Sequence, residues 1–372
     1  YFMRTLVQAV MAILLLSFSI QGYSKTVKLK IASMAPKGTS WGNALEAMAK
    51  EIRKATNKKV RLKLYLGGSA GDEPSVLRKI NSGIMHGGVF TGRALGDVNG
   101  DVRIMEVPFT FLDDRKKAWF TLQVMNKKLF NEGFEKRGFK NLGFFEIGKV
   151  YLVSTQKVTK IDELKGKKIW SWSGDDISAS LITSMQLVGV PLGLQDVLTS
   201  LSTGIIDTAY ASPMGVLALQ WQTKIKYLVD YPVTYSVGAL LLRQKFWDKI
   251  PTDPKNPEKD YRTIVRNIIK KHVDTANQRT VQENLDALKA MKDQGIEFLN
   301  FPKDSITEGR KIRQEVIDNL GGKLFSKDAV EYYNRVVGLP SSVTTVDGAI
   351  AKIAADIEAE KKAAEEKAKK GK

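Results

Sequence analysis

Two stretches in which strand patterns alternate with helix patterns constrain the fold of this chain most strongly. In the first, residues 27–33 and 60–66 alternate apolar with polar side chains, and residues 87–90 form a short apolar run. Between these runs, apolar residues recur at helical spacing from Trp41 and again after Glu73. This β-α-β-α-β order predicts a parallel sheet with right-handed crossovers.

The second stretch repeats this style over residues 150–236, and extended segments connect it to the first. Residues 144–155 form a long extended run, and short strand patterns then alternate with helix patterns. We therefore expect an α/β fold of two lobes, a clamshell whose ligand lies between them at the carboxyl ends of the strands. Hinge closure around a ligand is one of the standard transitions of such proteins.

After residue 244 the pattern is helical, with a long amphipathic stretch near 260–295 and further helices near 304–319 and 327–337. The last residues are rich in Ala, Lys and Glu, which indicates a solvated helix or a frayed tail that is not part of the core. The predicted division is a first lobe of residues 25–149 plus 237–340 with the C-terminal helices, a second lobe of residues 150–236, and a helical tail of residues 341–372.

Residues 1–24 are typical of a secretory signal peptide. Arg4 precedes about fifteen mostly apolar residues, and the small residues Gly22 and Ser24 follow. Cleavage is expected near Ser24, with Met3 as the initiator; an uncleaved N-terminal anchor is the alternative. Because the chain has no cysteine, it can carry neither a disulfide nor a lipid on an N-terminal cysteine. We expect a free protein in the periplasm.

Composition argues against catalysis and against nucleic acid. The only two histidines, His86 and His272, are far apart in sequence, and the metalloprotease pattern H-E-x-x-H does not occur. The acidic pairs at 113–114 and 175–176 resemble helix starts. The net charge of +18 comes from lysines spread over the whole chain, which indicates a basic solvated surface. We expect no enzyme activity, no cofactor, no metal and no nucleic-acid partner.

Several motifs, in a fixed order, resemble those of one transporter family. They are MAPKGTSWGNALEAMAKEI, GGSAGDEPSVLRKINSG, VPFTFLDDRKKAW, GFFEIG, IDELKGKKIW, VGVPLGLQDVLTSLSTGIIDTAY and LRQKFWDKIP. Over about residues 27–300 the chain resembles the substrate-binding subunit of tripartite ATP-independent periplasmic (TRAP) transporters, the DctP family. The resemblance implies a type II-like periplasmic binding fold with a long spanning helix. It also implies delivery of a solute to membrane permease subunits that use an ion gradient.

Three positions depart from the family pattern, and all three lose a polar group. Trp170 stands where the family usually has an arginine that grips the ligand's carboxylate, Val150 matches a second arginine, and Ala211 matches an asparagine. A guanidinium offers paired, charge-assisted hydrogen bonds, whereas an indole offers one neutral donor. We therefore expect a larger, more apolar or neutral ligand instead of a simple carboxylate, with one hydrogen bond available from an indole.

The candidate ligand-binding residues follow from strand ends and from this match. They are Trp41, Glu73, Phe90, Thr91, Glu146, Lys149, Val150, Tyr151, Trp170, Trp172, Tyr210, Ser212 and Met214. Trp41 and the paired tryptophans could instead be core residues, Glu73 could be a helix cap, and Glu146 could pair with Lys149 at a hinge. Lys149 could also replace the missing arginine.

Other functions remain open on the sequence alone. The chain could serve as a ligand receptor for a signalling or accessory periplasmic partner, or it could have a chaperone or structural role. The sequence does not indicate an oligomeric state.

Overall fold

The computed structural model describes residues 26–370, so the expected signal peptide lies outside the described residues. The strands are β1 (Val27–Ser33), β2 (Val60–Tyr65), β3 (Gly87–Thr91), β4 (Phe139–Ser154), β5 (Lys168–Ser171), β6 (Val188–Pro191), β7 (Thr208–Ala211), β8 (Tyr227–Val229), β9 (Thr234–Arg243) and β10 (Glu297–Leu299). The helices are α2 (Ser40–Ala55), α3 (Glu73–Asn81), α4 (Gly92–Val98), α5 (Arg115–Met125), α6 (Asn131–Lys136), α7 (Asp176–Ser184), α8 (Val197–Thr203), α9 (Pro213–Ala218), α10 (Gln244–Trp247), α11 (Tyr261–Asp293), α12 (Lys303–Leu320), α13 (Lys327–Val337) and α14 (Val346–Lys370).

The first lobe is built on the strand order β2-β1-β3-β9-β4. Strand β1 pairs in parallel with β2 and β3, and β9 lies antiparallel between β3 and β4. The connecting helices begin at side-chain caps, because the side-chain oxygen of Thr39 caps α2 and that of Asp72 caps α3. The predicted β-α-β-α-β unit is therefore confirmed.

The second lobe continues from the same long strand, with the order β4-β7-β5-β6, and β8 also pairs with β4. Strand β4 pairs with β9 in the first lobe and then with β7 and β8 in the second. Its register against β9 shifts between Glu146 and Gly148, and Gly148 has a φ of +98° that favours glycine. This irregularity lies where the chain passes between the lobes.

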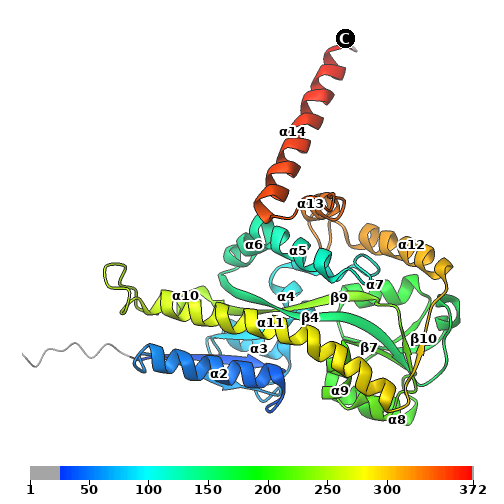
Figure 1. Ribbon diagram of the computed structural model, residues 1–372, viewed down its shortest axis with the longest axis horizontal. Helices are drawn as coiled ribbons and strands as arrows, with labels where there is room; N and C mark the ends of the chain where they lie inside the picture. Colours follow the sequence, from blue (N-terminus) through cyan, green and yellow to red (C-terminus); the bar gives the residue numbers. More distant parts are fainter. Residues whose placement is uncertain (1–25, 371–372) are drawn as a thin grey trace, which may run out of the picture.

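Helix α11 runs along both lobes (Figure 1), since it contacts α2 and β4 and also α9. Its 33 residues span roughly 50 Å at 1.5 Å per residue. The chain therefore reaches the second lobe, where β10 pairs with β8 and α12 packs against α7. Residues 297–320, which the sequence pattern assigns to the first lobe, contact the second lobe through β8 and α7, and Arg313 of α12 also donates a hydrogen bond to Thr110 of the first lobe.

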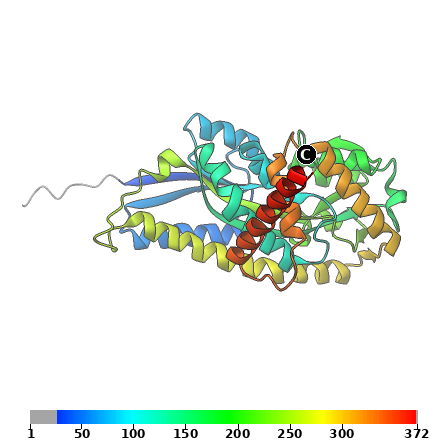
Figure 2. The same cartoon turned by 90° about the horizontal axis from the view of Figure 1, so that it is seen from above.

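The C-terminal helix α14 extends away from the rest of the molecule in Figure 1, whereas the view from above in Figure 2 looks onto it over the body of the molecule. Its first turns nevertheless contact α5, with Ala349 and Ile353 almost fully buried. The expectation that the tail contributes nothing to the core is wrong for these turns, because apolar residues there recur at helical spacing and meet the core. Across residues 26–370, no helix combines the length and the apolar character that a membrane span would need.

Candidate functional site

A cavity of about 280 Å³ lies between the two lobes. The first lobe contributes the loop after β1, the end of β3 and the 3₁₀ helix η1 (Gly100–Glu106). The second lobe contributes β5, α7, the end of β7 and α9, while β4 and β9 contribute from the connection. Strand ends and helix starts therefore meet at one place, as expected for a binding site in an α/β fold.

One wall of the cavity is aromatic. Trp170, at the end of β5, is 2% exposed and stacks on Tyr210 with ring centroids 5.0 Å apart. Trp172 and Trp221 contact it at 5.3 and 5.5 Å. The indole N–H of Trp170 donates to the carbonyl oxygen of Leu192 at 3.1 Å, so it is not available to a ligand. Trp170 offers apolar surface only, which corrects the expectation that this indole supplies a hydrogen bond.

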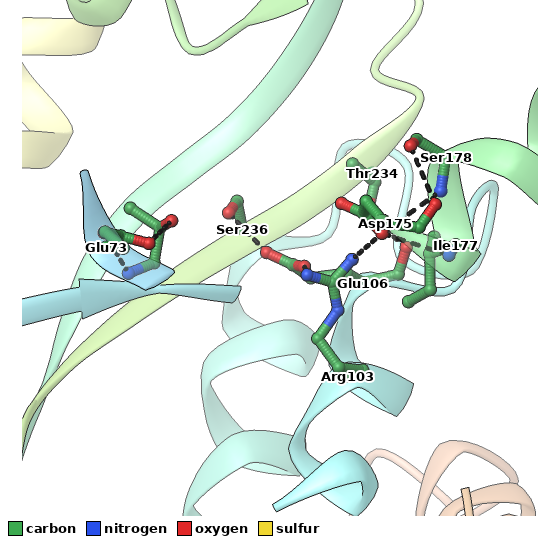
Figure 3. Close-up of polar contacts among 9 residues, drawn as sticks. Glu73, Arg103, Glu106, Asp175, Ile177, Ser178, Thr234 and Ser236 are labelled. Carbon is green, nitrogen blue, oxygen red and sulfur yellow. Dashed lines mark hydrogen bonds and ion pairs between the residues drawn. The ribbon is translucent and has the colours of Figure 1, made fainter. Parts of the chain in front are cut away.

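Buried charged side chains form the polar part of the cavity lining (Figure 3). Arg103 Nη2 donates to Asp175 Oδ1 at 2.7 Å, and Arg103 Nη1 lies 3.3 Å from Glu106 Oε2. Glu106 also accepts a hydrogen bond from the Ser236 hydroxyl. Arg103, Glu106 and Asp175 are each less than 10% exposed. Since buried charges are costly unless they are paired, the three form one cluster in which a single arginine pairs with two acids.

Glu73 is the other buried acid of the cavity lining, at 4% exposure. Its two carboxyl oxygens accept the backbone N–H and the hydroxyl of Thr91, each at 2.8 Å. Burial raises the pKa of Glu73 to about 7, because desolvation outweighs these two hydrogen bonds and the charge of Arg93. Burial likewise raises the pKa of Glu106, although Arg103 and Ser236 oppose that rise.

Nine of the thirteen candidate residues line the cavity. They are Trp41, Glu73, Phe90, Thr91, Val150, Trp170, Trp172, Tyr210 and Ser212. Glu73 also begins α3, but the residue that caps that helix is Asp72. The indole N–H of Trp41 donates to the Thr280 hydroxyl at 3.2 Å. Most of these residues lie at strand ends, which is the position that predicted them.

Four candidates lie outside the cavity. Tyr151 faces away because Val150 and Leu152, its neighbours along β4, point inward. Glu146 is held by two hydrogen bonds from Arg115, at 2.7 and 2.6 Å. Lys149 pairs with Asp113, so it does not replace the missing arginine.

Met214 is the fourth candidate outside the cavity. It lies on α9, and its backbone N–H donates to Asn284 of α11. The cavity-facing residues of α9 are instead Gly215 and Ala218.

The structure also brings charged residues into the site that the sequence did not reveal. Arg93, Arg103, Glu106 and Asp175 all line the cavity. The acidic pair 175–176 predicts a helix start, and Asp175 Oδ1 does accept the backbone N–H groups of Ile177 and Ser178. Its second partner, Arg103, is 72 residues away in the chain, so no local pattern could indicate the pair.

The sequence profile of the bacterial extracellular solute-binding proteins, family 7 (DctP), matches residues 31–324. The C4-dicarboxylate-binding periplasmic protein DctP of Rhodobacter capsulatus is 22% identical over 311 residues, which cover 83% of this chain and 91% of that protein. A solute-binding protein of Chromohalobacter salexigens is 26% identical over 205 residues. For that protein and for an uncharacterised protein of Haemophilus influenzae, the match spans only 60% and 62% of the relative's length.

Solved structures share the fold. A TRAP periplasmic solute-binding protein of Desulfovibrio salexigens, with bound orotic acid, superposes with a TM-score of 0.73 at 19% identity, covering 84% of this chain and 99% of that one. DctP7 of Bordetella pertussis, a receptor that binds pyroglutamic acid, gives 0.74 at 16% identity, covering 83% and 99%. These relatives are receptors for solutes and not enzymes. The two-lobed α/β fold, the interlobe cavity and the matched profile together show that this chain belongs to family 7 of the bacterial extracellular solute-binding proteins.

Proposed function

We propose that this protein is the solute receptor of a TRAP-type transporter. It captures a small molecule in the cavity between its lobes and delivers it to membrane permease subunits. The family match and the position of the cavity between two lobes that share β4 support this proposal. Export to the periplasm, with residues 1–24 acting as a signal peptide, is part of the same proposal.

The ligand is an apolar or neutral solute and not a simple carboxylate. The observation that carries this proposal is the aromatic wall of Trp170, Trp172, Tyr210 and Trp221, whose members contact one another at ring distances of 5.0 to 5.5 Å. Such a wall provides a large apolar contact area. The resemblance to the family implies an arginine that binds the ligand's carboxylate at the position of Trp170.

The charges of the cavity support the same proposal. Two arginines, Arg93 and Arg103, face three buried acids, Glu73, Glu106 and Asp175. Arg103 is already paired with Asp175 and Glu106, so an anionic ligand would find no unoccupied terminal nitrogen on that arginine. Proteins of this fold that bind acids include receptors with bound orotic acid and with β-D-galacturonate. We expect neither acid to bind here.

A thermal-shift screen tests this proposal. Uncharged aromatic and aliphatic solutes are compared with orotate and galacturonate, and we expect only uncharged solutes to raise the melting temperature. Trp170→Phe should reduce that shift. Trp247→Phe is the matched control, because Trp247 is equally buried but lies outside the cavity. Stabilisation by the acids alone, or equal effects of the two variants, would contradict the proposal.

A further inference from the structure

The ion pair between Arg103 and Asp175 joins the two lobes inside the cavity. Arg103 lies on η1 of the first lobe, and Asp175 immediately precedes α7 of the second. The two side chains are 4% and 9% exposed and 2.7 Å apart, and both line the cavity (Figure 3). A contact of this kind is normally made by a ligand in a two-lobed receptor, because the ligand touches both walls.

Asp175 uses the guanidinium of Arg103 as a ligand carboxylate would. It accepts from Nη2, while Glu106 faces Nη1 at 3.3 Å. Both terminal nitrogens of the arginine therefore already face carboxylates of the protein itself. Asp175 is fixed in this position because the same oxygen, Oδ1, also accepts the backbone N–H groups of Ile177 and Ser178 at 3.0 and 3.3 Å.

We propose that Asp175 is a specificity-determining residue: it acts as an internal counter-ion that occupies Arg103 and so excludes carboxylate ligands. This inference rests on the proposed function, in which the cavity is the ligand site. A carboxylate ligand would have to displace Asp175 and leave that charge buried beside Glu106, which is unfavourable. A neutral ligand leaves the ion pair intact.

The test uses benzoate and benzamide, two probes of nearly the same shape that differ in charge. Asp175→Asn keeps an oxygen that can cap α7 but removes the negative charge. We expect this variant to raise the affinity for benzoate relative to benzamide by about tenfold or more over the wild type, measured by calorimetry. Asp176→Asn, at the exposed neighbouring position, should leave the ratio unchanged.

The double variant Asp175→Asn, Arg103→Met should lose the increased preference for benzoate over benzamide, because the freed guanidinium is the group that binds benzoate. An unchanged benzoate-to-benzamide ratio in folded Asp175→Asn, or no benzoate binding to it at all, would overturn the inference. A gain that persists in the double variant would also overturn it. Asp175→Ser, whose hydroxyl can also cap α7, replaces Asp175→Asn if that variant does not fold.

Failure of the proposed function gives a different result. In that case the uncharged solutes of the thermal-shift screen would change the melting temperatures of wild type and Trp170→Phe equally. The benzoate-to-benzamide ratio reports instead on the Arg103–Asp175 pair, and the double variant isolates the part of Arg103.

Discussion

Replacing Glu73 by Gln should make the protein more stable at alkaline pH and change its stability little in mild acid. Glu73 is 4% exposed, and Thr91 makes both of its hydrogen bonds. Gln can keep both contacts, with its oxygen accepting from the backbone N–H and its amide donating to the hydroxyl. The substitution therefore removes the titration of Glu73 while it preserves the packing.

The magnitude follows from the pKa of Glu73, which burial raises from 4.5 to about 7. Between these two values the native state binds a proton that the unfolded chain has lost. Stability therefore falls as pH rises through this window, and the loss is complete above the native pKa. A pKa difference of this size corresponds to roughly 3 kcal/mol.

Urea unfolding of wild type and Glu73→Gln, at about pH 5 and about pH 8, measures this effect. Between these two pH values the difference between the two unfolding free energies should grow by roughly 2–3 kcal/mol in favour of the variant, because the unfolded carboxyl is already largely ionised at pH 5. Glu46→Gln, on the exposed face of α2, is the control and should show no such growth. A difference for Glu73→Gln that is flat with pH would refute the reasoning.

Three further predictions concern packing. A Cβ at Gly92 would lie 2.0 Å from Glu106 Oε2, so Gly92→Ala should force the buried carboxylate to move and destabilise the protein by about 1–3 kcal/mol in urea unfolding; an unchanged midpoint would contradict this. Ile353→Ala should cost about 2–4 kcal/mol because Ile353 is 1% exposed. Truncation after Lys361, which removes an exposed part of α14, should change the free energy of unfolding by less than about 1 kcal/mol; a large loss would show that this part of the helix packs.

The parts of the site that the sequence predicted are those set by local periodicity. Phe90 and Thr91 end β3, and Tyr210 lies near the end of β7, and all three line the cavity. The reason is general, because the carboxyl ends of neighbouring strands meet at one edge of a sheet. Trp170 lies at the end of a strand pattern, and for the same reason the sequence predicts that it lines the cavity.

The remaining parts depend on how distant segments meet. Arg103 and Asp175 belong to different lobes, and the packing of the two lobes brings them together. Lys149 was a plausible substitute for the missing arginine, but Asp113 from a neighbouring loop neutralises it. Neither contact leaves a periodic pattern in the sequence, so both require the folded structure.

Native mass spectrometry of the purified protein tests the central claim most directly, because it detects a small molecule that remains in the cavity. We predict an adduct whose mass identifies a neutral or apolar compound, retained by wild type and reduced in Trp170→Phe. A bound short-chain dicarboxylate, retained equally by both proteins, would contradict the account.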